Sequence, residues 1–306
     1  MASGPAEGSG TLDAMADDPG GHPRHVEHLL WNDRPTLREP VLVVAFGGWS
    51  DAGDAASTAV EYLADQWSTR SFASIDPEVF YDFTSTRPLV RFDEHGARRV
   101  DWPENTFSAG TVAEGDLDVI TLSGVEPQLR WRTFCDHVIA VAEAYDARLV
   151  VTLGALLADV PHSRPVSVFG TAYDDDLVDE LDLVPSRYEG PTGMTGLPPP
   201  ACHEAALRSA GLWAAVPAYV PSAPSPKAAM ALVERTAQLL RVGVSTTELQ
   251  LATAAYERQV SELVDEDVET IEYVAQLEER YDSEPESIND GVSLVDEVER
   301  FLRDQD

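Results

Sequence analysis

The sequence has little lysine and an excess of acid. Lys227 is the single lysine among 21 basic residues, and 54 acidic side chains give the 306-residue chain a formal net charge of −33. Nucleic acids and anionic membranes bind clustered Lys and Arg, so a chain of this charge repels them. We therefore predict neither a nucleic-acid partner nor a membrane partner.

Cysteine and long apolar runs are also scarce. Cys135 and Cys202 stand far apart and form no paired motif, which predicts no zinc or disulfide framework and is typical of a reducing compartment. No uninterrupted apolar run exceeds six residues, whereas a membrane span needs about 20. The first 25 residues lack the apolar core of a signal peptide. We expect a soluble, cytoplasmic protein without metal or cofactor.

Composition divides the chain into three parts. Residues 1–37 mix Gly, Pro and Asp without a hydrophobic period, which predicts a flexible tail. Residues 38–244 alternate short β-branched runs with Ala-rich amphipathic segments, the pattern of an α/β core domain. Residues 245–306 hold 19 acids and four arginines, and we predict an acidic helical extension there.

Several segments of the central part predict strands followed by helices. Residues 41–46, VLVVAF, form a run continuous enough for a strand covered on both faces. Helical spacing follows over 52–67, with one side formed by Ala56, Val60, Leu63 and Trp67. Further strands are expected at 118–122, 148–154, near 167 and at 212, and further helices over 131–145 and from 226. Residues 79–102 predict extended segments around an Asp-Glu-His-Gly turn, so we expect a mainly parallel sheet with a short antiparallel excursion.

The extension carries one apolar stripe at helical spacing that ends at the SEPES sequence. Its members are Val260, Val264, Val268, Ile271, Val274 and Leu277. A second short helix is expected around Val295, Val298 and Leu302. The stripe is most simply a face docked on the core or on another subunit.

The loop after the first strand, GGWSDAGDAAS, is a candidate anion site. Gly47 and Gly48 stand where a helix begins, and the unpaired N–H groups of a helix N-terminus favour negative charge. Asp51 or Asp54 could instead cap that helix, which would be a structural role. Both interpretations remain open from the sequence.

Two Arg-Pro corners place further candidates after extended runs. Arg87, His162 and Arg164 then lie at the strand ends where α/β sheets bind ligands. A guanidinium suits a carboxylate or phosphate, and a histidine moves protons near neutral pH. The alternative is that each arginine pairs with one of the abundant acids.

Two more candidates come from unusual local sequence. YEGPTGM at 188–194 combines Glu189 with a tight turn containing Thr192, which forms either a ligand contact or only a helix entry. Lys227 follows Ser225-Pro226 at a helix start, where the dipole disfavours a cation. We therefore expect a specific acceptor or anion beside it.

Long ordered motifs then identify a family resemblance that covers about residues 29–303. They are AFGGWSDAGDAAS, IDPEVFYDF, TRP, the WP at 102, SGVEPQLRWRTF, LGALLADVPHSRP, YEGPTG, LWAAVPAYVPSAPSPKAAMAL and EVERFL. Together they resemble the bacterial branch of the proteasome assembly chaperone family. The resemblance implies a three-layer α/β/α fold with a mainly parallel sheet similar to nucleoside phosphorylases, a C-terminal helical extension and self-association.

The chain departs from that family pattern at three places. Gly47 stands where an acid is usual, and Ala218 stands where histidine is frequent. Chaperones that dock on proteasome α-rings often end in a hydrophobic-Tyr-any tail, whereas this chain ends at Arg303-Asp304-Gln305-Asp306. If the acid usual at position 47 and the histidine frequent at position 218 did acid–base work, this member would lack both groups, which weakens an enzymatic interpretation.

Two hypotheses about function follow. The first is a non-catalytic assembly or interaction factor that binds a protein partner or copies of itself, as a homo-oligomer with a trimer among the candidates. The second is a small-molecule binder or phosphorylase-like or hydrolase-like enzyme for phosphate, nucleosides or sugar phosphates. Its ligand-binding candidates are Gly47, Gly48, Asp51, Arg87, His162, Arg164, Glu189, Thr192 and Lys227.

Overall fold

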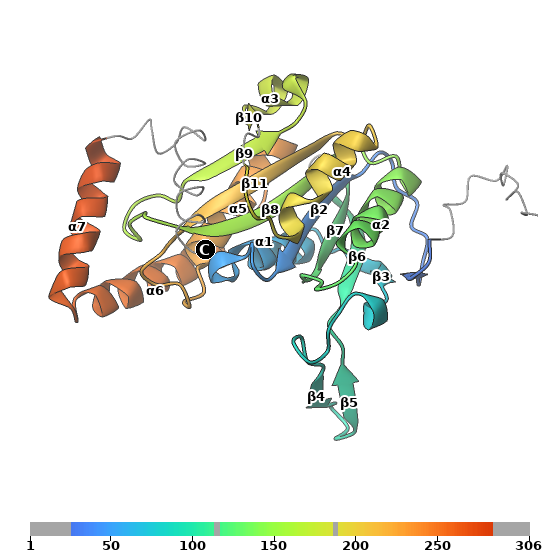
Figure 1. Cartoon of the computed structure of the whole chain (residues 1–306), viewed down its shortest axis with the longest axis horizontal. Helices are drawn as coiled ribbons and strands as arrows, with labels where there is room; N and C mark the ends of the chain where they lie inside the picture. The colour runs from blue at the N-terminus through green and yellow to red at the C-terminus, as the bar shows by residue number, and fades with distance from the viewer. Residues whose placement is uncertain (1–25, 113–116, 186–188, 284–306) are drawn as a thin grey trace, which may run out of the picture.

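A nine-stranded sheet forms the centre of the computed structural model, which describes residues 26–112, 117–185 and 189–283. The strand order is β1-β3-β6-β7-β2-β8-β11-β9-β10 (Figure 1). These strands are β1 (Leu29–Trp31), β2 (Val41–Gly47), β3 (Arg70–Ile75), β6 (Asn105–Val112), β7 (Leu117–Val125), β8 (Leu149–Ala158), β9 (Val168–Ala172), β10 (Val184–Pro185) and β11 (Ser209–Pro217).

Helices connect the strands and cover the sheet. The α-helices are α1 (Ala55–Gln66), α2 (Trp131–Ala144), α3 (Asp175–Leu181), α4 (Pro198–Glu204), α5 (Pro226–Leu240), α6 (Thr247–Val264) and α7 (Val268–Ser283). Short 3-10 turns are η1 (Ala52–Asp54), η2 (Pro77–Val79) and η3 (Met194–Gly196). No helix in the described ranges is long and apolar enough to cross a membrane.

The sheet is parallel at its centre and mostly antiparallel outside it, although β9 and β10 at one edge pair in parallel. Strands β7, β2, β8 and β11 pair in parallel. Three antiparallel pairings join β7, β6, β3 and β1 on one side, and β11 pairs antiparallel with β9 on the other. The antiparallel part is therefore larger than the short excursion expected from the sequence.

Each face of the sheet packs against its own helices, which confirms an α/β fold with helices on both sides. Val41, Val43 and Ala45 of β2 pack in the cluster formed with α1 and α5. The alternating Leu42 and Phe46 pack in the cluster formed with α2 and α4. Because every residue of the run is buried, β2 needs apolar side chains at consecutive positions.

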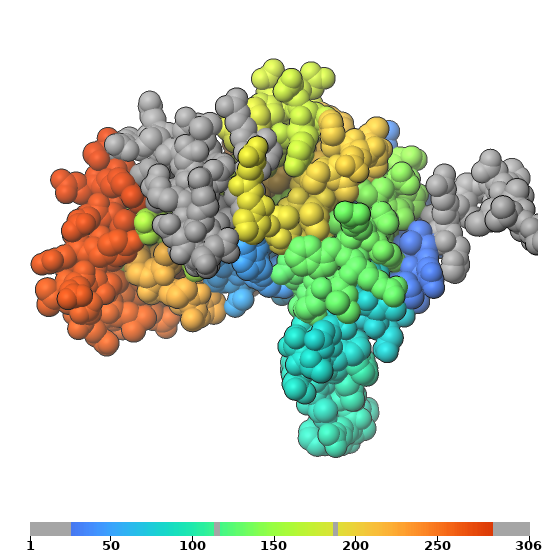
Figure 2. Space-filling model, viewed as in Figure 1, coloured from blue at the N-terminus to red at the C-terminus, as the bar shows by residue number. Residues whose placement is uncertain are grey.

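A two-stranded hairpin projects from the body of the molecule (Figures 1 and 2). Strands β4 (Leu89–Phe92) and β5 (Arg98–Asp101) pair antiparallel around a turn at 93–97. This confirms the extended segments predicted around the Asp-Glu-His-Gly turn. We call residues 87–104 the arm.

The ends of the chain differ in part from the expectation. Leu29–Trp31 fall within the predicted tail, yet they pair with β3 because the edge of that strand offers unpaired backbone groups. The predicted apolar stripe does not lie on one helix, since the chain turns between α6 and α7 and leaves Val268 exposed. The second helix expected near Val295 lies outside the described residues.

Candidate functional site at the carboxyl ends of the central strands

The loops after four parallel strands meet at one edge of the sheet. Segments after β2, β7, β8 and β11 follow the carboxyl ends of these strands, where open α/β sheets form their binding sites. Two structures occupy this edge. One is a cavity, and the other is the contact between the edge and helices α6 and α7.

The first structure, which we call the rim cavity, has a volume of about 620 Å³. It lies between residues 48–54, one face of strands β8, β9 and β11, and residues 190–200. Four aromatic side chains contribute to its walls, namely Trp49, Phe169, Tyr173 and Trp213. Of the residues proposed from the sequence, Gly48, Asp51 and Thr192 line it.

Asp51 acts as a cap for α1. Its carboxylate accepts hydrogen bonds from the backbone N–H of Ala56 (2.7 Å) and Ser57 (3.1 Å) and from the Ser57 hydroxyl (2.5 Å). Burial raises the pKa of Asp51, and the bonds from Ser57 and Ala56 oppose that shift. Because Asp51 takes the N–H groups that a bound anion would need, the structural alternative for this loop fits the geometry and the anion cradle does not.

Glu126 connects the two loops that border the cavity. Its carboxylate accepts from Trp49 N–H (3.1 Å) and from Met194 N–H (2.6 Å). Gly48 has φ +150°, and a Cβ there would lie 2.8 Å from the Glu126 Cβ, so glycine is required for this approach. Glu126 is not among the candidates from the sequence, although an acid four residues after the strand expected at 118–122 was the available signal.

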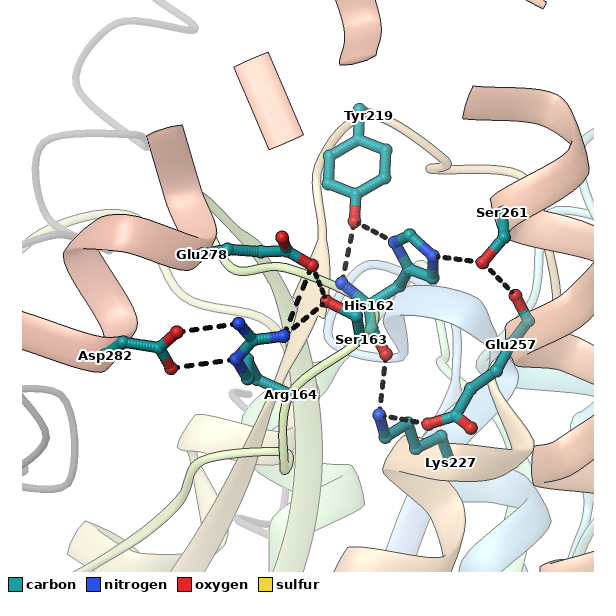
Figure 3. Close-up of polar contacts among 9 residues, drawn as sticks. All are labelled: His162, Ser163, Arg164, Tyr219, Lys227, Glu257, Ser261, Glu278 and Asp282. Carbon is teal, nitrogen blue, oxygen red and sulfur yellow. Dashed lines mark hydrogen bonds and ion pairs between the residues drawn. The ribbon is translucent and has the colours of Figure 1, made fainter. Parts of the chain in front are cut away.

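The second structure, which we call the helix junction, joins the loops after β8 and β11 to α6 and α7 (Figure 3). Lys227 donates to the backbone oxygen of His162 (2.6 Å) and pairs with Glu257 of α6 (2.5 Å). The acceptor expected beside Lys227 is therefore present. An ammonium that is disfavoured at a helix start is held there by a carboxylate and a carbonyl.

His162 lies at the centre of the helix junction as a buried, hydrogen-bonded ring (Figure 3). Nδ1 lies 2.7 Å from the Tyr219 hydroxyl and Nε2 lies 3.0 Å from Ser261 Oγ, which donates to the Glu257 backbone oxygen. One neutral tautomer satisfies all these contacts, with Tyr219 donating to Nδ1 and Nε2 donating to Ser261. Burial and the neighbouring Lys227 lower the pKa of His162.

Replacing His162 with glutamine is expected to make the chain less sensitive to acid. The unfolded chain takes up a proton below about pH 6.5 that the folded ring, with its lowered pKa, resists. The neutral ring therefore contributes fully to the free energy of unfolding above about pH 6.5. This contribution declines as the pH falls toward the pKa of His162 in the folded chain, by at most ~1.4 kcal/mol per pH unit.

Urea unfolding at about pH 7.5 and about pH 5.5 measures this difference. The control is His203→Gln, which changes a more exposed histidine that pairs with Asp174 away from the helix junction. Wild type and the control should lose more stability on acidification than His162→Gln. Equal losses in all three proteins would contradict the assignment.

Arg164 fastens the helix junction to the end of α7. Its guanidinium donates to both carboxylate oxygens of Asp282 (2.8 and 2.7 Å) and to Glu278 (3.3 Å). The bonds from Arg164 lower the pKa of Asp282, and Asp282 raises the pKa of Arg164. Arg164 is thus paired with acids, which was the alternative to a ligand role.

The residues proposed from the sequence do not form one site. Arg87 is exposed at the root of the arm, and Glu189 is exposed and outside the cavity lining. Gly47 ends β2, where its carbonyl accepts from Glu126 N–H (2.8 Å). His162, Arg164 and Lys227 belong to the helix junction rather than to the cavity.

Comparison with known proteins gives both a family match and similar solved structures. The model of the PAC2 family matches residues 45–264. A crystal structure of a PAC2 family protein from Streptomyces avermitilis is 45% identical, covers 77% of this chain and 99% of its own, and has a TM-score of 0.72. No protein among those with curated functions matches.

Two structures from Mycobacterium tuberculosis are also similar. The proteasome-assembly chaperone homologue Rv2125 is 44% identical over 76% of this chain and 99% of its own, with a TM-score of 0.69. Rv2714, described as a protein of unknown function, is 30% identical over 93% of this chain and 98% of its own, with a TM-score of 0.79. This last similarity extends over nearly the whole sequence.

Proposed function

Because the chain belongs to the PAC2 family, we propose that it is a non-catalytic assembly factor that associates with copies of itself through the arm. The family match confirms the resemblance noted in the sequence. Rv2125, a bacterial relative at 44% identity, is described as a proteasome-assembly chaperone homologue. That description supports an assembly role for this chain.

The observation that carries the proposal is an exposed apolar face on the arm. Val90 pairs with Val100 across the hairpin and Phe92 pairs with Arg98, so these side chains share a face. Trp102 follows directly after β5 and packs edge-on against Phe83. Phe92 is 74% exposed and Trp102 is 51% exposed, which places a row of apolar side chains in water.

The opposite face of the arm carries paired charges beside the exposed Leu89. Asp101 accepts from Arg99 (2.7 Å) and pairs with Arg91 (3.0 Å) on that side. A two-stranded hairpin is marginally stable when neither face packs against other structure. The apolar face therefore gains most from a second surface, since burying one large apolar side chain is worth about 1.5–3 kcal/mol.

Charge favours a second copy of this chain as the occupant. The chain carries a net charge of −33, so contact between most surfaces of two copies brings like charges together. Residues 89–101 carry no net charge, because three arginines match three acids, namely Arg91, Arg98 and Arg99 with Asp93, Glu94 and Asp101. The arm combines this balance with an exposed apolar face, so it offers a contact at low electrostatic cost.

The helix junction supports a role without catalysis. His162, Lys227 and Arg164 are the residues that an enzymatic interpretation would use for proton transfer and anion binding. In the structure they hold α6 and α7 against the sheet domain through Ser261, Glu257 and Asp282. Their contacts account for their positions without a substrate.

The replacement Phe92→Asp tests self-association through the arm. Wild type should sediment as an oligomer at micromolar concentration, and Phe92→Asp should raise the dissociation constant at least ~10-fold. The control is Leu251→Asp, because Leu251 on α6 is 71% exposed and thus similar in exposure. A monomeric wild type, or equal effects of both variants, would contradict the proposal.

Mixing the protein with separated proteasome α and β subunits tests the assembly role. Wild type should speed formation of the full particle on native gels, and Phe92→Asp should not. If oligomers depend on the arm but particle formation is unchanged by wild type, the assembly role falls and self-association stands.

A further inference from the structure

We propose that the rim cavity binds an uncharged organic molecule with a flat ring and with hydroxyl or amide groups along one edge. This proposal does not depend on the arm or on self-association. It rests on the floor of the cavity, on buried hydroxyl groups and on the charges of the lining. A volume of about 620 Å³ lies within the range of small-molecule sites.

The floor of the cavity contains a row of polar groups across three strands. Gly211 of β11 pairs with Thr152 of β8 and with Thr171 of β9, so all three residues share one face of the sheet. A Cβ at Gly211 would lie 3.3 Å from Thr152 Oγ1, from Thr171 Oγ1 and from Trp213 Nε1. Two hydroxyls and one indole N–H therefore converge on the space above a residue without a side chain.

The next row of the floor is aromatic. Trp213 pairs with Gly154 of β8 and with Phe169 of β9. A Cβ at Gly154 would lie 2.5 Å from the indole ring, so the glycine lets Trp213 lie close against the strand. Trp49 and Tyr173 also line the cavity. Aromatic walls beside a polar row suit a flat ring with polar groups on one edge.

Three hydroxyl groups in this lining are buried without a hydrogen-bond partner among the described residues. They are Ser50 Oγ, Thr152 Oγ1 and Thr195 Oγ1, in residues that are each 4% exposed or less. An unpaired buried hydroxyl costs free energy that a ligand group can return by bonding to it. Because all three residues line the cavity, we expect its ligand to carry polar groups.

The charges of the lining exclude the anionic ligands suggested by the sequence. The charged side chains among the described lining residues are Asp51 and Asp54, and neither lysine, arginine nor histidine is among them. An anion would meet two carboxylates in a chain of net charge −33 without a compensating cation. Phosphate and sugar phosphates therefore do not fit this cavity, whereas uncharged molecules do.

Two pairs of probes that differ in charge test the proposal. Adenosine is compared with AMP, and 4-nitrophenyl β-D-glucoside with 4-nitrophenyl phosphate, by ligand-observed NMR and by quenching of tryptophan fluorescence. At least one uncharged probe should bind, and its anionic counterpart should bind ~10-fold or more weakly. Quenching is expected because Trp49 and Trp213 line the cavity.

Two variants locate the binding in the cavity. Gly211→Ala fills the space between the polar groups and should abolish binding. Thr152→Val removes an unpartnered hydroxyl, so it should raise the melting temperature by ~2 °C. It should also raise the dissociation constant of the probe ~5–10-fold. A hydroxyl with a purely structural bond would instead lower the melting temperature when removed. Thr171→Val replaces Gly211→Ala if that variant does not fold.

Several results would overturn the proposal. The proposal fails if neither uncharged probe binds, or if the anionic probes bind as well as the uncharged ones. It also fails if the folded Gly211→Ala, or its substitute Thr171→Val, binds the probe like wild type. A lowered melting temperature of Thr152→Val would also overturn it, because the hydroxyl would then make a structural hydrogen bond instead of awaiting a ligand.

Discussion

Replacing Gly124 with alanine should destabilise the fold by about 3 kcal/mol, at the upper end of what one added methyl group costs in a well-packed core. A Cβ at this position in β7 would lie 2.2 Å from Asn105 Oδ1 and 2.3 Å from the Glu104 carbonyl oxygen. Asn105 is fully buried, and the carbonyl belongs to the backbone, so neither group can move aside cheaply. The strands must shift instead.

This substitution should also disturb the root of the arm. Tyr81 donates to the Val125 carbonyl (2.5 Å), and Asn105 Nδ2 donates to the same oxygen (3.1 Å). Urea unfolding measures the effect, with Gly47→Ala as the control because a Cβ there meets nothing closer than 3.8 Å. Similar free energies of unfolding for the two variants would show that a Cβ at position 124 fits beside Asn105 and Glu104 without displacing the strands.

Lys227→Met should release α6 and α7 from the sheet domain and cost about 2 kcal/mol. The change leaves the His162 carbonyl and Glu257 without their donor. The Glu257 side chain is 40% exposed, so water compensates part of the loss and the cost stays below that of a fully buried pair. Protection of α6 and α7 in hydrogen exchange should fall first.

The matched control for Lys227→Met is Arg235→Met on the same helix. Arg235 donates to the backbone oxygens of Leu181 and Asp182, away from the helix junction. A double-mutant cycle with Glu257→Gln isolates the pair itself. Unchanged exchange in α6 and α7 after Lys227→Met would show that apolar packing alone holds these helices.

Local periodicity predicted the elements whose own sequence determines them. The apolar stripe of α1 and the continuous run of β2 were predicted because α1 buries one face and β2 buries both. Helix α4 was not, because it starts with Pro198, Pro199 and Pro200. Proline is tolerated in a first turn, where its missing N–H has no partner in any case, but in sequence it resembles a loop.

The break between α6 and α7 shows where periodicity alone misleads. Val264 and Val268 stand four apart and continue one stripe, so spacing predicts a single helix. Asp267 instead accepts from the Thr270 N–H (2.9 Å) and starts a new helix. A capping acid between two matching apolar positions was the local signal that outweighed the stripe.

The sequence predicted where the candidate site lies but not which residues come together in it. Loops after the strands did gather at one edge, because parallel strands share a direction. Which loops meet depends on long-range contacts. His162 and Lys227 therefore contact side chains of α6 and do not lie beside Asp51. Thr152 and Gly211 look like ordinary strand residues in sequence, since only the register between strands aligns them.

The main sheet ends on both sides in very short strands, with three residues in β1 and two in β10. A long bare edge would let another chain extend the sheet and grow into fibrils. In the described part of the chain, these short ends offer few free backbone groups for such growth. The self-association proposed for the arm would therefore use side-chain contacts rather than extension of the main sheet.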